Sequence, residues 1–174
     1  MGEMDIKNFK KDLIDTLNKI SKTSLDEVTE IDVYRAIGVM LQNHIGEDWT
    51  NTHNQQKEKD VKRMYYISME FLTGKFTSKN LQYLGLYDIV KDAVELLGFS
   101  FDKVLQVENE PGLGNGGLGR LAVAFLDSLA SLRLPGHGYG LRYEKGLFKQ
   151  EISNGSQVET ADDWLSEIDI WQYK

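Results

Sequence analysis

The stretch PGLGNGGLGRLAVAFLDSLASLRLP, residues 111–135, decides the fold of this chain. Five of the eight residues from Gly112 to Gly119 are glycine, and an apolar run with helical spacing follows at once. Glycine accepts positive φ and lets another group approach the backbone closely. A helix that begins at such a loop directs unpaired N–H groups and the positive end of its dipole outward. The stretch therefore predicts an anion site, most often one for phosphate.

The helix after this loop is predicted to be buried, because apolar residues surround most of its circumference. Its loop would then face a cleft. After Pro135 three glycines alternate with larger residues, which predicts a strand with one bare face against which a helix or a ligand lies. A hairpin follows, with strands over 147–152 and 156–160 around Asn154-Gly155. The apolar positions of the helix are Leu121, Ala122, Val123, Ala124, Phe125, Leu126, Leu129, Ala130 and Leu132.

The first half of the chain reads as helix-rich. Apolar residues at helical spacing predict helices over 5–20 and 30–45, the second capped by Ser24 or Thr29. The second helix either ends at Gly46 or continues through Trp49 towards Lys57. The near-continuous apolar run within 63–71 predicts a strand buried on both faces, as in a parallel sheet. Two short helices, 76–84 and 87–97, are split by Gly85, and Ser100 is predicted to cap a further turn over 101–106.

Composition narrows the class of protein. The net charge of −7 argues against a nucleic-acid binder. With no cysteine there is neither a disulfide framework nor a thiolate metal site, and the three histidines are scattered, so no metal site is expected. The N-terminus is amphipathic and no apolar run is long enough for a membrane span, so we expect no signal peptide and a cytoplasmic protein.

Other functional interpretations of these residues are weaker. The loop fits G-x-G-x-x-G twice, but a dinucleotide site needs a clean preceding strand and an acid about 20 residues on, and VENEP is a poor strand. Leu118 stands where a Walker loop needs lysine. A loop that needs glycine only for close packing remains an alternative. Glu159, Asp162 and Asp163 could suggest paired acids for glycoside hydrolysis, but acids at a helix N-terminus are favoured.

Four stretches, in the right order, resemble the α-glucan phosphorylases, the glycogen and maltodextrin phosphorylases. They are YYISMEFLTGK (65–75), GLGNGGLGRLAVAFLDSLASL (112–132), PGHGYGLRYEKGLFKQ (135–150) and ETADDWL (159–165). Enzymes of this family are several times longer and have two large lobes. The resemblance covers the start of the first lobe. It implies an α/β fold, the N-terminal part of a Rossmann-like lobe of a GT-B type glycosyltransferase, with a helical segment over 1–62 and the start of the α/β lobe over 63–174.

The resemblance also implies a function. The full-length enzyme would carry out phosphorolysis of α-1,4-glucan to glucose 1-phosphate with pyridoxal phosphate, whose attachment lysine is not in this chain. Gly116 and Gly117 would lie at the cofactor, and Asn115, Gly117 and Leu118 at the substrate. No catalytic residue is expected in this segment. The expected partners are glucan, phosphate and a second copy of the chain, and the segment alone would be inactive. The alternatives are a non-catalytic phosphorylase-like interaction module and a nucleotide-binding α/β domain.

The chain also departs from the family pattern. Lys75 stands where the family usually has arginine, and residues 168–170, Ile-Asp-Ile, replace the usual Gly-Asn-Pro. These changes leave the glucan preference open. The N-terminus lacks the extension that carries the phosphorylation switch of animal members, and residues 54–57 lack the aromatic that stacks on AMP. Animal-type regulation is therefore not expected, and the allosteric site is expected to be absent.

Overall fold

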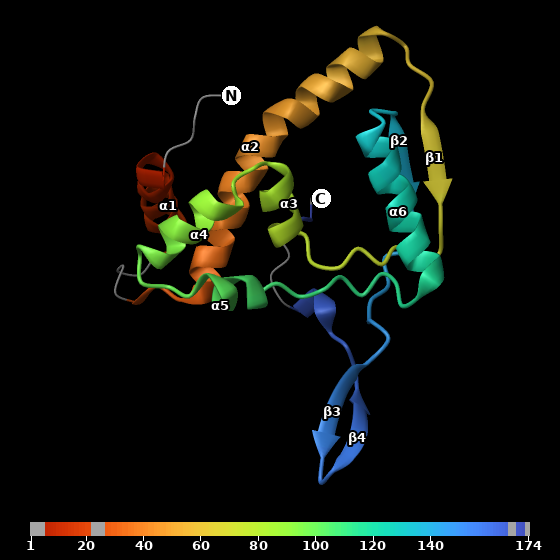
Figure 1. The fold of residues 1–174 in the computed structure, drawn as a ribbon. Coiled ribbons are helices and arrows are strands. Elements are labelled where there is room, and N and C mark those ends of the chain that lie inside the picture. The colour runs from red at the N-terminus through yellow and green to blue at the C-terminus, as the bar shows by residue number, and fades with distance from the viewer. Residues whose placement is uncertain (1–5, 22–26, 167–169, 173–174) are drawn as a thin grey trace. The chain divides into compact units, whose positions relative to one another are not determined.

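The computed structural model describes residues 6–21, 27–166 and 170–172. They form two compact units (Figure 1). The first, here called the helical unit, takes in residues 1–49, 75–109 and 168–174. The second, the glycine-loop unit, takes in residues 50–74 and 110–167. Both helices and strands are present, so the chain has a mixed, helix-rich α/β structure.

The helical unit is built from short amphipathic helices around one core. The helices are α1 (Ile6–Ile20), the first part of α2 (Glu30–Glu58), α3 (Thr77–Tyr83), α4 (Tyr87–Glu95) and α5 (Phe101–Gln106). The predicted helices are confirmed, including the continuation of α2 beyond Gly46. The core side chains, all at most 2% exposed, include Phe9, Leu13, Leu17, Val33, Tyr34, Ile37, Leu41, Leu81, Val90, Val94, Phe101 and Val104.

Local signals set the ends of these helices. Thr29 and Asp32 form a capping box at the start of α2, in which the Thr29 N–H donates to Asp32 Oδ2 at 3.0 Å and the Asp32 N–H to Thr29 Oγ1 at 3.4 Å. Hydrogen bonds from the hydroxyl and the N–H of Thr29, assisted by Arg35, lower the pKa of the Asp32 carboxyl. Gly85 and Gly98 take φ of +67° and +89° where α3 and α4 end. Thr29 is thus confirmed as a cap, whereas Ser24 lies outside the described residues.

Three further contacts tie the helical unit together. Glu108, only 4% exposed, accepts hydrogen bonds from the N–H groups of Phe76 at 2.7 Å and Thr77 at 3.1 Å, so it caps α3 from thirty residues away. Ser100 caps α5 as predicted, by accepting from the N–H of Lys103. Ile170 is buried against Gly38 of α2. Residues 168 and 169 lie outside the described residues.

The glycine-loop unit contains a parallel strand pair and a helix. Strand β1 (Met64–Ile67) pairs with β2 (Gly136–Tyr139), and Met64 faces Gly136 in the register. Helix α6 (Gly117–Ser131) packs on β2 (Figure 1). A Cβ added at Gly136 would meet Leu129, and one at Gly138 would meet Leu126 and Phe71. The bare glycine face predicted from the alternating pattern is therefore confirmed, and a helix lies against it.

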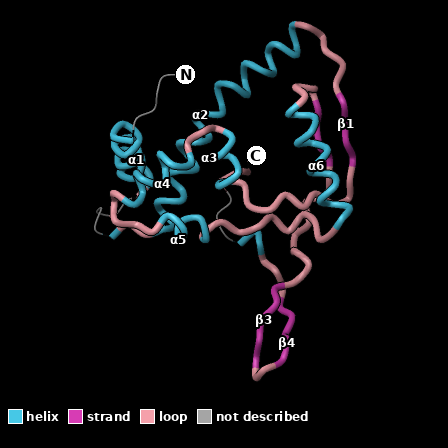
Figure 2. Tube along the Cα trace, in the orientation of Figure 1, coloured by secondary structure: helices cyan, strands magenta, loops and turns pink. Residues whose placement is uncertain are grey.

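The remaining elements are a hairpin and a single helical turn. Strands β3 (Lys149–Ser153) and β4 (Ser156–Thr160) are antiparallel (Figure 2), and η2 (Trp164–Ser166) is a 3-10 turn. Asn154 and Gly155 take φ of 50° and 77°, the two positive values that a type I′ turn requires. The hairpin prediction is confirmed. Among the described residues, no helix is both long and apolar enough to cross a membrane.

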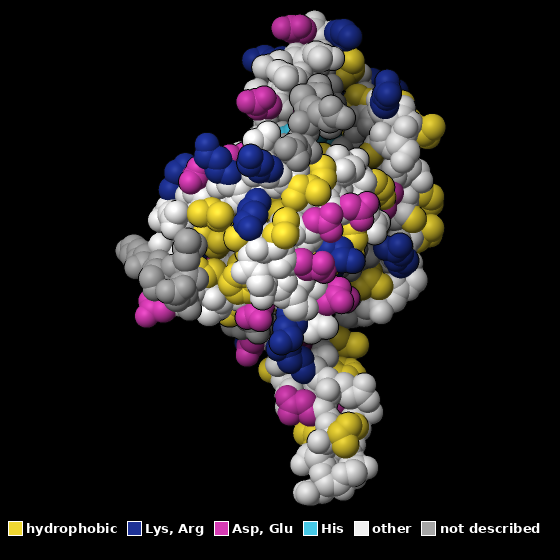
Figure 3. Space-filling view, turned by 60° about the vertical axis from the view of Figure 1, so that its left-hand side comes forward, with side chains coloured by type: hydrophobic (Ala, Val, Ile, Leu, Met, Phe, Trp, Pro, Cys, Tyr) yellow, Lys and Arg dark blue, Asp and Glu magenta, His cyan; other side chains and the backbone are white. Residues whose placement is uncertain are grey.

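Two burial predictions are wrong. Strand β1 is not covered on both faces, since Ile67 is 82% exposed. Helix α6 does not lie in an interior, because Leu118, Leu121 and Phe125 are about half exposed. Apolar composition indicates which surfaces favour burial, but burial also needs a second surface to pack against, and α6 packs on β2 through one face. Figure 3 shows apolar side chains that reach the surface among charged ones.

Candidate functional site

The candidate site is the glycine loop where it enters α6. Gly116 is the N-cap residue, extended at φ −151° and ψ −152°, and the N–H of Arg120 closes the first turn by donating to the Gly116 carbonyl at 3.0 Å. The N–H groups of Gly117, Leu118 and Gly119 come before that bond, so the helix itself supplies them no acceptor. Asn115, Gly116, Gly117 and Leu118 are all exposed. The four residues predicted to bind cofactor and substrate thus form one continuous exposed edge.

The loop glycines fall into two groups. A Cβ at Gly114 or Gly119 would lie 2.6 or 2.9 Å from the Leu72 backbone nitrogen, and one at Gly112 would overlap the Trp164 ring. A Cβ at Gly116 or Gly117 would meet no atom within 4 Å. None of the five has a φ in the left-handed region. Close packing therefore explains three of these glycines but not the two that were predicted to contact the cofactor.

The groups that hold the loop come from residues 68–72, here called the Glu70 turn, which directly follows β1. Three hydrogen bonds join the two segments: Phe71 N–H to the Leu113 carbonyl at 2.9 Å, Asn115 N–H to Glu70 Oε2 at 3.1 Å, and Leu72 N–H to the Gly119 carbonyl at 3.0 Å. They are spaced along the whole loop, from its start to the first turn of α6. The Glu70 turn therefore holds the backbone of the loop in place through these three hydrogen bonds.

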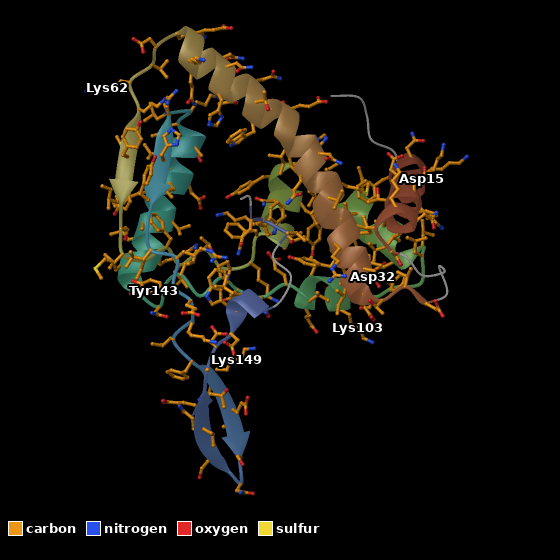
Figure 4. All side chains as sticks on the ribbon, turned by 180° about the vertical axis from the view of Figure 1, so that it is seen from behind. Asp15, Asp32, Lys62, Lys103, Tyr143 and Lys149 are labelled. Carbon is orange, nitrogen blue, oxygen red and sulfur yellow. The ribbon has the colours of Figure 1, made fainter. Side chains whose placement is uncertain are left out.

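Further side chains support the Glu70 turn and the loop from within the same unit. Tyr143, on the segment that follows β2 (Figure 4), donates its hydroxyl to the Met69 carbonyl at 2.9 Å. Trp164 is 5% exposed and donates its indole N–H to the Tyr143 carbonyl at 3.2 Å. Because Gly112 lies directly against the Trp164 ring, these two aromatic residues support both segments.

The acids of the ETADDWL stretch have structural partners. Asp163 forms an ion pair with Lys145, and the Asp162 side chain lies against Gly146, whose N–H donates to the Asp162 carbonyl at 3.0 Å. Glu159 is exposed on β4. This arrangement suits a structural role better than acid catalysis. Over the residues that the structure describes, no cluster of three or more His, Asp or Glu side chains could hold a metal ion.

Sequence reasoning missed one charged group of the site, Glu70. The available signal was positional, since Glu70 comes just after the carboxyl end of a predicted parallel strand, where site residues of α/β proteins collect. A single acid within YYISMEFLTGK carries no other chemical signal. Only the fold brings its carboxylate to Asn115, 45 positions later.

Similarity to known proteins extends over most of the chain. The family model described as carbohydrate phosphorylase matches residues 94–174. Glycogen phosphorylase of Bacillus subtilis is 44% identical over 151 residues, 87% of this chain and 19% of that protein. The Chlamydia trachomatis enzyme is 48% identical over 141 residues, 81% of this chain and 17% of the relative. The brain form of Bos taurus is 42% identical over 166 residues, 95% of this chain and 19% of the relative. The chain spans about one fifth of these relatives' length.

Proposed function

The chain belongs to the carbohydrate phosphorylase family, and we propose that it supplies the glycine-loop part of an α-1,4-glucan phosphorylase. The reaction is phosphorolysis, in which the terminal glycosidic bond breaks and the glucosyl group passes to phosphate as glucose 1-phosphate. The observation that carries the proposal is the exposed edge Asn115–Leu118, which lies within the residues that match the family model. The Glu70 turn holds this edge through the hydrogen bond to Asn115. The wider fold in this proposal is a two-lobe GT-B glycosyltransferase.

The loop has the features that an anion needs from it. The N–H groups of Gly117 and Leu118 open the helix without an intrahelical acceptor, and the absence of Cβ atoms at Gly116 and Gly117 leaves room for a phosphate to approach the backbone. Donors fixed in this way stabilise negative charge without reorganising during the reaction. The side chain of Asn115 can donate to or accept from a sugar hydroxyl.

The residues present also fit part of a pyridoxal phosphate site. Open backbone at Gly116 and Gly117 allows a flat cofactor to lie against the loop, and no side chain projects from either residue. When bound there, pyridoxal phosphate would supply acid–base chemistry through its phosphate group. The attachment lysine belongs, in this proposal, to a part of the family's fold that this chain does not span.

The partners in this proposal are glucan, phosphate and a second copy of the protein, in the cytoplasm. Exposed apolar residues on α6 and β1 support association with further polypeptide, since large apolar patches usually mark interfaces. They also support the second candidate, a non-catalytic interaction module of the same family. A nucleotide-binding domain is disfavoured, because residues 107–111 form no strand before the glycine loop.

The test compares the protein encoded by the whole gene with the 174-residue chain. Each is incubated with maltodextrin, phosphate and pyridoxal phosphate, and glucose 1-phosphate is measured. We expect turnover by the whole protein and none by the chain alone. Gly117→Val in the whole protein should lower the rate about 10²–10³-fold, as loss of one fixed backbone donor does in comparable sites. A whole protein that binds the cofactor but forms no glucose 1-phosphate would favour the interaction module.

A further inference from the structure

We propose that Glu70 is the positioning residue of the glycine loop: its carboxylate fixes the Asn115 peptide and thereby keeps the N–H groups of Gly117 and Leu118 turned to the open side. The effect on turnover rests on the proposed function. The effect on the loop itself does not, and it is measured separately.

The Glu70 bond differs from its two neighbours in kind. The bonds from Phe71 and Leu72 to the loop join backbone to backbone, so any residue except proline could make them. The bond from Asn115 N–H to Glu70 Oε2, at 3.1 Å, needs an acceptor side chain of this length. It also lies between the other two along the loop, at the first residue of the exposed edge. The loop therefore depends on one side chain at the point where ligand contacts are proposed.

Gly119 leaves the space that the Glu70 side chain occupies. A Cβ at Gly119 would lie 3.1 Å from Glu70 Cβ and 3.2 Å from Glu70 Oε2. The carboxylate therefore sits beside the first turn of α6, where a negative charge interacts favourably with the helix dipole. A hydrogen bond to a charged oxygen is also roughly twice as strong as a neutral one. The Glu70 side chain therefore takes this position because residue 119 is a glycine, whose missing Cβ leaves the space.

The start of α6 has no other side-chain anchor of its own. Gly116 occupies the N-cap position and makes no side-chain hydrogen bond to the helix. A serine or aspartate there would bind the N–H of the second or third helical residue, the donors that a ligand would otherwise use. Glu70 instead binds the N–H just before the cap. This arrangement orients the first turn and leaves its donors available.

The first experiment measures amide hydrogen exchange in the ligand-free whole protein. Glu70→Ala should speed exchange at Asn115 at least tenfold, whereas Glu70→Gln, which keeps an acceptor oxygen, should stay within about threefold of the wild type. Glu110→Ala, at an exposed carboxylate just before the loop, is the matched control and should leave exchange at Asn115 unchanged. If the alanine variant does not fold, Glu70→Asp, too short to reach the same position, replaces it with the same expectation.

The second experiment measures phosphorolysis by the same variants. We expect kcat to fall ten- to a hundredfold in Glu70→Ala, with a melting temperature close to that of the wild type and recovery in Glu70→Gln. Unchanged exchange at Asn115 in the alanine or aspartate variant would overturn the positioning role. An equal effect of Glu110→Ala would overturn it too. If no variant or wild-type protein forms glucose 1-phosphate, the proposed function fails while the exchange data still decide the role of Glu70.

Discussion

Substituting alanine for Gly114 and for Gly117 should have opposite effects on stability, although the two glycines lie three residues apart in one loop. A Cβ added at Gly114 would lie 2.6 Å from the Leu72 nitrogen and 2.9 Å from the Phe71 carbonyl carbon, against ordinary contacts of 3.4–4 Å. Both neighbours are backbone atoms, and the Phe71 N–H is bonded to the Leu113 carbonyl. The loop and the Glu70 turn must therefore move apart.

The cost of that movement follows from overpacking. Forcing an extra methyl group into a closely packed place costs about 1–3 kcal/mol. For a chain of this size each kcal/mol lowers the melting temperature by roughly 2–4 °C. At Gly117 the added methyl group meets nothing within 4 Å, and alanine favours the helix over glycine by up to about 1 kcal/mol. Gly117→Ala should therefore leave the melting temperature unchanged or raise it slightly.

The assay is thermal and urea unfolding followed by circular dichroism, on both variants and the wild type under one set of conditions. Gly116→Ala serves as a second control at an open position. The reasoning is refuted if Gly114→Ala unfolds at the wild-type temperature, or if Gly117→Ala is destabilised as much as Gly114→Ala. The first result would mean that the backbone approach between Gly114 and Leu72 does not constrain the loop, and the second that the open space at Gly117 does not make a side chain tolerable there.

Three further outcomes are expected. Glu108→Ala leaves the N–H groups of Phe76 and Thr77 without their buried acceptor. It should lower the free energy of unfolding in urea by roughly 2–4 kcal/mol, and Glu108→Gln should lower it by less. A change in that free energy below about 0.5 kcal/mol would contradict the capping role. Asp32→Asn should be less stable than wild type at pH 7, and the difference should shrink as the pH falls below about 4 and through the folded-state pKa of Asp32, which hydrogen bonds from Thr29 lower. A difference that does not decrease as the pH falls would argue against this. The 174-residue chain should associate through its exposed apolar residues, and light scattering that gives the monomer mass at every concentration would exclude this.

Local signals allowed much of the fold to be predicted. Several capping and turn residues affect only the backbone within a few positions of themselves, so their effects could be predicted from the neighbouring sequence. They are Thr29, Ser100, Gly85 and the pair Asn154-Gly155. The alternation of glycines after Pro135 also predicted a bare strand face that would accept a helix or a ligand, and α6 lies against that face of β2.

Burial and the division of the loop glycines could not be predicted in the same way. The apolar circumference of α6 indicates a helix suited to an interior, but Leu121 and Phe125 are exposed, and no periodicity rule states what covers a helix. The distinction between Gly114 and Gly117 depends on where Leu72 passes, 42 positions before Gly114. The role of Glu70 depends on the same long-range approach, which no spacing rule contains.

The pairing of β1 with β2 has a kinetic consequence. Met64 meets Gly136, 72 positions later, whereas the β3–β4 hairpin closes over a two-residue turn. Closing the longer loop costs about 2–3 kcal/mol more in chain entropy than closing a hairpin of four residues. Contacts between residues so far apart in the sequence form late, whereas a hairpin forms within about 1–10 μs. Strands β1 and β2 would thus pair near the end of folding, and a nascent chain could form this pair only after residue 139 has left the ribosome.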